Sequence, residues 1–333
     1  MHDTGLRIFT LNASRDFAQG VAKALGVDLG RHEERDFVDG EHKARILENV
    51  RGKDVFVIQS LHSDVQQSVN DKLIRLLWFL GSIRDASAAR VTAVIPYLCY
   101  ARKERKTKSR DPVSSRYLAA ILEAVGIDRV MTLDVHNLAA YQNAFRIHSE
   151  HLEAKKLFVD YFSAQEGGSE QVVISPDVGG VKRAELFRQA LQARLGTPVG
   201  SGFMEKQRSA GVVSGETLVG NVKGKAVIIL DDLISSGGTI ARTVKACHQA
   251  GARHISAAAS HGLFVANADE VLADSALDEL VVTNTVPAFR LHSESVKAKL
   301  VILNVAPLFG EAIRCIHEGG SIVELLATGD DIA

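Results

Sequence analysis

Two adjacent carboxylates and a glycine-rich turn follow a short apolar run in the C-terminal half of the chain. The run from Val227 to Leu230 is typical of a buried strand, and residues 239–250 have the apolar spacing of an amphipathic helix. The turn would therefore present the N–H groups of a helix N-terminus, which bind phosphate. The two acids, expected at the end of the strand, can accept hydrogen bonds from sugar hydroxyls or hold a cation. We call this set of residues the cradle: Asp231, Asp232, Ser235, Ser236, Gly237, Gly238 and Thr239.

The cradle sequence also fits a plain strand-to-helix turn in which an aspartate caps the helix. Such a turn needs one acid, whereas this chain has two acids followed by Ser-Ser-Gly-Gly-Thr. We therefore favour a site for a sugar phosphate over a purely structural turn.

Other polar residues follow predicted strands or lie on predicted loops. His136 and Asp177 follow apolar runs, so both are expected at the carboxyl edges of sheets, where ligands of open α/β folds bind. A lone histidine there is more often a hydrogen-bonded loop residue than a ligand, and Asp177 can equally cap the next helix, with Lys182 and Arg183 as first-turn surface charges. Residues 206 and 208, Lys and Arg, would share one face of an extended segment, a pattern that a solvated hairpin edge also has.

The segment 102–110 contains six basic residues in nine, which by itself suggests a nucleic-acid or localisation patch. No aromatic residues are interleaved with these charges, and the chain of 333 residues has a net charge of −1. We therefore expect a small polyphosphate, and no nucleic acid, as the ligand of this loop.

The composition indicates a globular protein with room for two ordinary domains, since 46% of the residues are hydrophobic and 24% are charged. No run approaches the ~18 apolar residues of a membrane span, and the N-terminus lacks the pattern of a targeting segment. Cys99, Cys247 and Cys315 lie far apart, which is typical of reduced thiols. We expect a cytoplasmic protein without a membrane partner.

Hydrophobic patterns predict strands that alternate with helices along the whole chain. The expected strands are 6–10, 54–59, 91–95, 130–133, 171–175, 226–230, 255–260, 280–283 and 299–303. The clearest expected helices are 15–25, 65–86, 113–125, 152–162, 180–194, 239–250 and 307–317.

A faint internal repeat divides the chain, because residues 52–60 resemble 224–232 and residues 88–96 resemble 251–259. It predicts two related α/β domains, which we assign to residues 1–148 and 149–333. Where the C-terminal half has the cradle, the N-terminal half has Gln59-Ser-Leu-His-Ser-Asp64, with no glycine and no acid pair. We therefore expect one sugar-phosphate site per chain.

Taken together, these loops resemble those of the ribose-phosphate pyrophosphokinases, the enzymes that make phosphoribosyl pyrophosphate. The resemblance covers nearly all of residues 6–326. It implies two tandem domains of the type I phosphoribosyltransferase fold, each a mainly parallel sheet flanked by helices. It also implies ATP and Mg²⁺ as co-reactants and a homo-oligomer, a hexamer, whose ATP site is shared between subunits. The matching segments are FVDGE at 37–41, NVRGKD at 49–54, VIPY at 94–97, YARKERK at 100–106, DVH at 134–136, SPDVGGVKR at 175–183, KQR at 206–208 and DDLISSGGT at 231–239.

The resemblance implies a role for each candidate residue in a reaction in which the anomeric hydroxyl of ribose 5-phosphate attacks the β-phosphorus of ATP and AMP leaves. Lys206 and Arg208 are the catalytic cations, and the cradle, together with Arg208, binds ribose 5-phosphate. His136 and Asp177 contact Mg²⁺–ATP, although Mg²⁺ prefers oxygen ligands and a contact of His136 through water or phosphate is easier to accept. The ATP-binding residues are Phe37, which stacks on adenine, Asp39, Gly40 and Glu41, which shape the pocket, and Arg102 and Lys103, which hold the phosphates.

Three positions depart from the family pattern. Ser235 stands where an acid is common, and Lys103 and Glu104 stand where a Gln-Asp pair is usual. A cradle built from backbone N–H groups does not require that acid, so we expect sugar-phosphate binding to persist. Two alternatives remain open: a phosphoribosyltransferase, which would use the same cradle, and a non-catalytic regulatory homologue, which would be expected to lose the catalytic loop.

Overall fold

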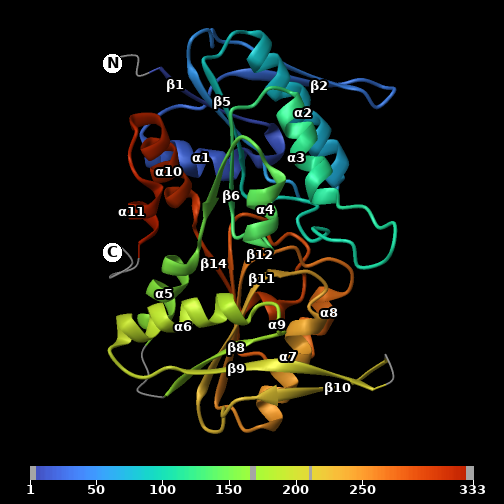
Figure 1. Cartoon of the computed structure of the whole chain (residues 1–333), viewed down its shortest axis with the longest axis vertical. Coiled ribbons are helices and arrows are strands. Elements are labelled where there is room, and N and C mark those ends of the chain that lie inside the picture. The colour runs from blue at the N-terminus through green and yellow to red at the C-terminus, as the bar shows by residue number, and fades with distance from the viewer. Residues whose placement is uncertain (1–4, 166–169, 210–211, 328–333) are drawn as a thin grey trace. The chain divides into compact units, whose positions relative to one another are not determined.

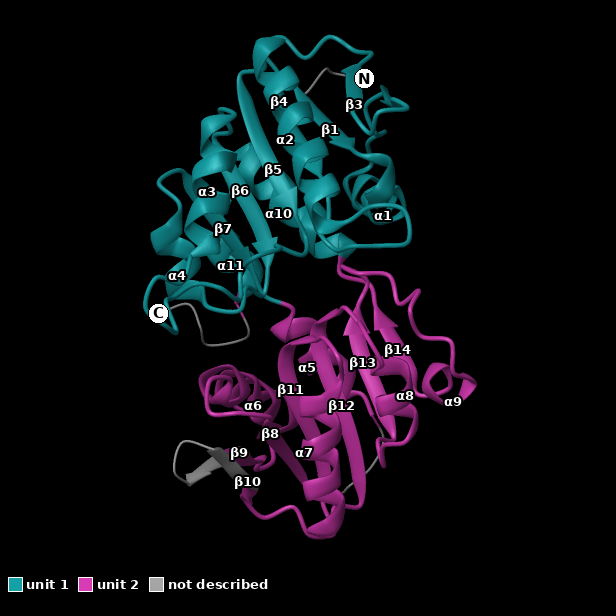
Figure 2. Ribbon diagram, turned by 90° about the vertical axis from the view of Figure 1, so that its right-hand side faces the viewer, with its two compact units in different colours: residues 1–153, 306–326 teal, residues 154–305, 327–333 magenta. Residues whose placement is uncertain are grey.

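The computed structural model describes residues 5–165, 170–209 and 212–327, without the side chains of residues 206–216. By its contacts the chain divides into two compact units, which Figure 2 shows in different colours. The first contains Met1–Glu153 and Ala306–Leu326, and the second contains Ala154–Val305 and Ala327–Ala333. Each unit has its own α/β layers and is described by itself.

The first unit is built on five parallel strands in the order β1-β4-β5-β6-β7. All five residues of β4 are buried, as expected of a strand covered on both faces. Leu76 and Leu80 of α2 and Leu118 and Leu122 of α3 belong to the apolar core that covers one face of this sheet. The elements, labelled in Figure 1 except for β4 and β7, which Figure 2 labels, are β1 (Leu6–Thr10), α1 (Arg15–Leu25), β4 (Asp54–Ile58), α2 (Val69–Asp85), β5 (Arg90–Ile95), α3 (Ser114–Ala124), β6 (Arg129–Leu133), α4 (Leu138–Ala144) and β7 (His148–Leu152).

An antiparallel ribbon of β2 (His32–Asp36) and β3 (His42–Ile46) extends from this unit. Ala44 and Ile46 pack against the core beside α2, and Arg75 of α2 forms an ion pair with Asp36 at 2.5 Å. The sequence did not predict the ribbon, because its charged residues hide the apolar alternation that identifies a strand.

The C-terminal helices α10 (Ala306–Glu318) and α11 (Ile322–Leu326) belong to the first unit by their contacts. The ring of Phe309 packs edge-on against Phe17 of α1 with centroids 5.4 Å apart. A Cβ at Gly20 of α1 would lie 2.9 Å from the Cβ of Ala306, so only glycine permits this approach. The compact units therefore differ from a simple division of the chain into two halves, and the functional domains 1–148 and 149–333 stay a prediction.

The second unit is built on seven strands in the order β10-β9-β8-β11-β12-β13-β14, in which β10 alone runs antiparallel among the paired strands described. No helix in the described part of either unit is long and apolar enough to cross a membrane. The elements of the second unit are α5 (Lys155–Ser163), β8 (Gln171–Ser175), α6 (Val181–Leu195), β9 (Gly200–Ser209), β10 (Val212–Val219), β11 (Ala226–Ile234), α7 (Gly238–Gln249), β12 (His254–Gly262), α8 (Ala268–Ala273), β13 (Glu279–Thr283), α9 (Glu294–Lys297) and β14 (Leu300–Leu303).

The predicted α/β architecture is confirmed, and every strand and helix predicted from the sequence is present with small shifts at its ends. One shift matters for the site, because β11 continues to Ile234. Asp231 and Asp232 therefore lie within the strand, and the expectation that they emerge after it was wrong. The reason is that pairing with β12 extends to Ile234 opposite Gly262, whereas pairing with β8 stops at Ile229.

Candidate functional site

The cradle joins the end of β11 to the start of α7. Gly237 is the N-cap of α7 with φ +76°, and among the described residues no side chain caps this helix. A Cβ on Gly237 would lie 3.3 Å from Leu272, so both the backbone conformation and the space favour glycine. The N–H groups of the first turn are left for an external acceptor, which is the arrangement that binds anions at helix N-termini.

The two acids of the cradle differ in exposure. The side chain of Asp232 is 3% exposed and accepts a hydrogen bond from Nη1 of Arg183 at 3.1 Å. Asp231 is 22% exposed, lies 3.5 Å from the same nitrogen and accepts the N–H of Asp232 at 2.8 Å. Burial and the neighbouring Asp232 carboxylate raise the pKa of Asp231 above its ordinary value. Asp231 is therefore the acid that a ligand can reach, and Arg183 offsets the charge of the pair.

Arg183 is a site residue that the sequence alone did not identify. It lies in the first turn of α6, and its bond to Asp232 shows that the interpretation as a surface charge was wrong. The available signal was its place in the segment 175–183, at the end of a strand that neighbours β11 in the sheet.

Asp177 lies in the turn between β8 and α6, beside the cradle at the same edge of the sheet. Its Oδ1 accepts the N–H of Gly180 at 3.0 Å, and its backbone carbonyl accepts the Ser175 hydroxyl at 2.7 Å. Asp177 thus orders the turn before α6, while the N-cap of that helix is Gly180. Its second carboxylate oxygen has no hydrogen-bond donor within the described ranges, so the residue retains an oxygen suited to a hard cation.

The backbone of Lys206 and Arg208 belongs to β9, which pairs with β10 opposite Glu216 and Val213. The predicted extended segment is therefore confirmed. The side chains of both residues lie outside the described part of the chain, and their catalytic role stays a prediction.

In the first unit, the predicted phosphate loop and His136 meet at one edge of the sheet. The loop with Arg102 and Lys103 follows β5, and the exposed His136 follows the neighbouring strand β6. Lys103 does not point freely into solvent, because its Nζ donates to the carboxylate of Asp111 at 2.6 Å and to Thr107 at 3.1 Å. Arg102 is exposed.

The segment 37–41 forms the turn of the β2–β3 ribbon. The N–H of Phe37 donates to the carbonyl of Glu41 at 2.9 Å, and the N–H of Glu41 donates to the Asp39 carboxylate at 3.1 Å. Gly40 has φ +90°, as such a turn requires. The Phe37 ring is 38% exposed and lies 5.1 Å from the guanidinium of Arg35. The guanidinium of Arg35 thus lies over one face of the Phe37 ring at the tip of the ribbon.

Backbone strain gathers at the same edges. Six non-glycine residues in the described chain have a left-handed φ, and five of them lie in loops that follow parallel strands. Such conformations cost about 1–3 kcal/mol each and cluster at functional sites, which makes these loops candidates for ligand binding. The five residues are Tyr100, Arg110, Asp134, Phe264 and Ala266.

The N-terminal counterpart of the cradle, after β4, is filled by the protein itself. Asp64 accepts the N–H groups of Gln66 and Gln67 at 2.8 Å and the Nζ of the fully buried Lys72 at 2.6 Å. Helix α2 begins with a capping box between Ser68 and Asp71. Both the donors and the helix terminus are therefore already engaged, in contrast to those of the cradle.

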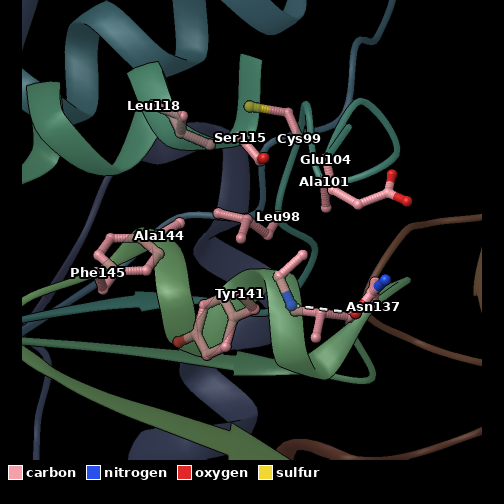
Figure 3. Close-up of a pocket in the computed structure, with 12 residues that line it drawn as sticks. Leu98, Cys99, Ala101, Glu104, Ser115, Leu118, Asn137, Tyr141, Ala144 and Phe145 are labelled. Atoms are coloured by element: carbon pink, nitrogen blue, oxygen red, sulfur yellow. Dashed lines mark hydrogen bonds between the residues drawn. The ribbon is translucent and has the colours of Figure 1, made fainter. Parts of the chain in front are cut away.

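A small cavity lies beneath the loop that carries Arg102 and Lys103, between α3 and α4 (Figure 3). Its volume is about 10 Å³, which is room for about one water molecule. Cys99 lines this cavity, and burial raises the pKa of its thiol to about 12. The cysteine therefore serves packing, and the cavity is too small for a nucleotide.

Comparison with known proteins agrees with this geometry. Residues 6–126 match the model of the N-terminal domain of ribose phosphate pyrophosphokinase, and residues 211–327 match the phosphoribosyl synthetase-associated domain. Ribose-phosphate pyrophosphokinase 1 of Listeria innocua is 39% identical over 97% of this chain and 98% of its own. The enzyme of Caldanaerobacter subterraneus is 40% identical over the same shares. The crystal structure of phosphoribosylpyrophosphate synthetase from Mycobacterium smegmatis superposes with a TM-score of 0.85 and 35% identity, covering 95% of this chain and 99% of that one.

Proposed function

The chain belongs to the ribose-phosphate pyrophosphokinase family, with its phosphoribosyltransferase-like fold, and from that premise we propose how its residues divide the reaction. The reaction transfers the β,γ-pyrophosphoryl group of ATP to the anomeric hydroxyl of ribose 5-phosphate, giving phosphoribosyl pyrophosphate and AMP. Its demands are orientation of the nucleophile and balance of charge on a crowded triphosphate.

The open N-terminus of α7 is the observation that carries the proposal for the acceptor site. The 5-phosphate accepts hydrogen bonds from the N–H groups after Gly237, with the hydroxyls of Ser235, Ser236 and Thr239 as further donors. Asp231, the more exposed acid, orients the ribose hydroxyls, while Asp232 acts from beneath through its bond to Arg183.

ATP is assigned to the first unit. Arg102 and Lys103 bind its phosphates, so Lys103 exchanges the Asp111 carboxylate for a phosphate oxygen. The adenine stacks on Phe37, and the turn residues 39–41 contact its edge through backbone groups already ordered by Asp39.

Mg²⁺ prefers oxygen ligands, so the carboxylate of Asp177 suits it better than the imidazole of His136. A bound Mg²⁺ would take most of its ligands from ATP and water. We assign Asp177, through its remaining carboxylate oxygen, as the protein ligand, and His136 to a contact through water or phosphate. The ion would offset charge on the triphosphate. Lys206 and Arg208 are assigned to stabilise the group in transfer.

The assembly is assigned as a homo-oligomer, a hexamer, with ATP shared between neighbouring subunits. Support comes from large apolar side chains exposed on two helices that cover the same core, Ile74 and Trp78 on α2 and Tyr117 and Ile121 on α3. Trp78 is the single tryptophan and is 57% exposed in the isolated chain, so its fluorescence should shift to the blue with increasing protein concentration as light scattering reports a rising mass. The buried, unpaired Cys99 and Cys247 support a cytoplasmic location.

One assay tests the activity against its alternatives. The purified chain is incubated with Mg²⁺, ATP and ribose 5-phosphate, and we expect stoichiometric AMP and phosphoribosyl pyrophosphate. Formation of ADP, or no nucleotide turnover at saturating substrate, would contradict the proposal. A phosphoribosyltransferase would instead consume phosphoribosyl pyrophosphate with a base, and a regulatory homologue would act only on an active partner.

A further inference from the structure

The segment that follows β12 holds the beginning of the cradle. The N–H groups of Leu263 and Phe264 donate to the carbonyl of Ile234 at 2.9 and 3.2 Å, and the N–H of Val265 donates to the carbonyl of Ser235 at 3.0 Å. The carbonyl of the cradle residue Ser235 and that of Ile234 before it are therefore fixed by one neighbouring segment. The path of the backbone into Gly237 depends on where that segment lies.

This supporting segment, Leu263 to Val265, is itself held in an unfavourable conformation. Phe264 has φ +46° although its side chain is buried at 1% exposure, and Ala266 has φ +55°. A Cβ at Gly262 would lie 2.4 Å from the Phe264 ring, which leaves no room for any other residue. Backbone strain of this kind persists only where the surroundings impose it.

Arg290 supplies such a restraint from the loop between β13 and α9. Its Nη1 donates to the carbonyl of Leu263 at 2.9 Å, and its guanidinium carbon lies 4.4 Å from the centre of the Phe289 ring. A hydrogen bond from a charged donor is about twice as strong as a neutral one. Stacking on an aromatic face fixes the plane of the guanidinium, which a lysine cannot reproduce.

We propose that Arg290 is a positioning residue for the sugar-phosphate site, acting on the cradle through Leu263. This inference rests on the proposed role of the cradle as the 5-phosphate site. When the guanidinium is removed, the supporting segment relaxes, and the N–H groups after Gly237 no longer point at the position of the 5-phosphate. Misplacement of a binding group by about 1 Å can cost up to ~10²-fold in rate. We expect the effect to fall on the KM for ribose 5-phosphate, because the residues assigned to the adenine and the phosphates of ATP lie in the first unit.

Arg290→Met in the full chain tests the proposal, with Arg188→Met as the matched control. Arg188 also donates through Nη1 to a backbone carbonyl in the same unit, that of Val199 at 3.0 Å, but at the far end of α6 from the cradle. We expect the KM for ribose 5-phosphate to rise roughly 10-fold in Arg290→Met, with the KM for ATP unchanged and neither constant changed in Arg188→Met. Equal KM values for ribose 5-phosphate in the two variants would overturn the proposal.

Two further variants keep the result interpretable. Arg290→Lys retains the charge without the planar stack, so its KM for ribose 5-phosphate should lie between those of the wild type and Arg290→Met. If Arg290→Lys has the wild-type KM, the role of the guanidinium is contradicted. This test remains valid even when Arg290→Met does not fold. Gly237→Val changes the cradle backbone itself, because a side chain is strained at φ +76° and its Cβ would lie 3.3 Å from Leu272. If Gly237→Val leaves the KM for ribose 5-phosphate unchanged, the assignment of the cradle fails. A raised KM in Gly237→Val with a wild-type KM in Arg290→Met removes only the role of Arg290.

Discussion

The guanidinium of Arg183 lies 3.1 Å from the carboxylate of Asp232, whose side chain is 97% enclosed by the protein. A strand and a helix that are separated by about fifty residues in sequence are thereby joined by one ion pair under the proposed substrate site. Its loss would take one partner from a buried carboxylate, and a hydrogen bond to a charged group contributes about 1.5–3 kcal/mol.

Arg183→Met should therefore lower both the stability of the second unit and kcat/KM for ribose 5-phosphate, the latter by about 10²-fold, corresponding to ~2.7 kcal/mol. Calorimetry and steady-state kinetics measure the two effects. Arg188→Met, which removes an ion pair with Glu185 on the same helix, should be near the wild type. Adding Asp232→Asn should recover part of the stability without the activity. A fully active Arg183→Met variant would show that the pair is dispensable.

Asp231→Asn should make the protein without substrate more stable at neutral pH and much less active. Burial and Asp232 raise the pKa of Asp231, so the native state binds a proton that the unfolded state has already lost above a pH of about 3.9. Stability therefore falls as pH rises from that value through the raised pKa, and Asn removes this fall. Melting temperatures of the two proteins should agree near pH 4 and diverge towards pH 8, with Asn higher. Parallel curves would contradict the pKa shift.

Asp64→Asn should show the opposite pH dependence. Partial burial by itself raises the pKa of Asp64, but hydrogen bonds from Lys72 and from the N–H groups of Gln67 and Gln66 outweigh it and lower the pKa below its ordinary value. Its contribution is therefore present above the unfolded pKa and disappears as pH falls through the lowered one. Lys72 is fully buried and keeps His62 at 3.3 Å, so we expect Asp64→Asn to lower the free energy of unfolding by about 1.5–3 kcal/mol near pH 7, and by less towards pH 3.

The exposed Asp28 provides a control for both aspartate variants, since Asp28→Asn should change the melting curve little at any pH. If Asp64→Asn lowers the stability by the same amount at every pH, the contact with Lys72 depends on the shape of the side chain and not on its charge.

Cysteine reactivity should be confined to one residue of the folded chain. Burial raises the pKa of the Cys99 and Cys247 thiols to about 12, so almost no thiolate exists at pH 8. Cys315 is partly exposed. A thiol reagent should therefore label one residue of three in the native protein, and Cys315→Ser should show almost no labelling until it is denatured. Rapid labelling of Cys99 would reveal opening of the loop above it.

Local sequence patterns were sufficient for most of the parallel strands and the long helices of both units, because buried parallel strands are continuous apolar runs. They located the Gly-Gly-Thr turn before α7, but they missed β7 and the short helices α4, α8, α9 and α11. They were not sufficient for the β2–β3 ribbon, whose inner face carries His32, Glu34 and His42 in place of apolar residues. They also did not separate the two cradle acids, since the exposure of Asp231 and the enclosure of Asp232 depend on Arg183, which is distant in sequence.

Tertiary pairing likewise explains why the supporting segment and Arg290 were missed. Neither Leu263 to Val265 nor Arg290 belongs to a recognisable motif, and their importance arises only where the carbonyls of Ile234 and Ser235 need donors. The close contact of Gly20 with Ala306 was missed for the same reason, because no pattern near Gly20 indicates a partner at the other end of the chain.

That fit has a consequence for the order in which the protein matures on the ribosome. Domains commonly fold as they are synthesised, N-terminal first. Here the face of α1 that carries Phe17 stays uncovered until α10, about 290 residues later, has left the exit tunnel. The unit that is translated first is therefore completed only after nearly the whole chain has been synthesised, and a ribosome stalled before Ala306 would hold a first unit with an exposed apolar helix.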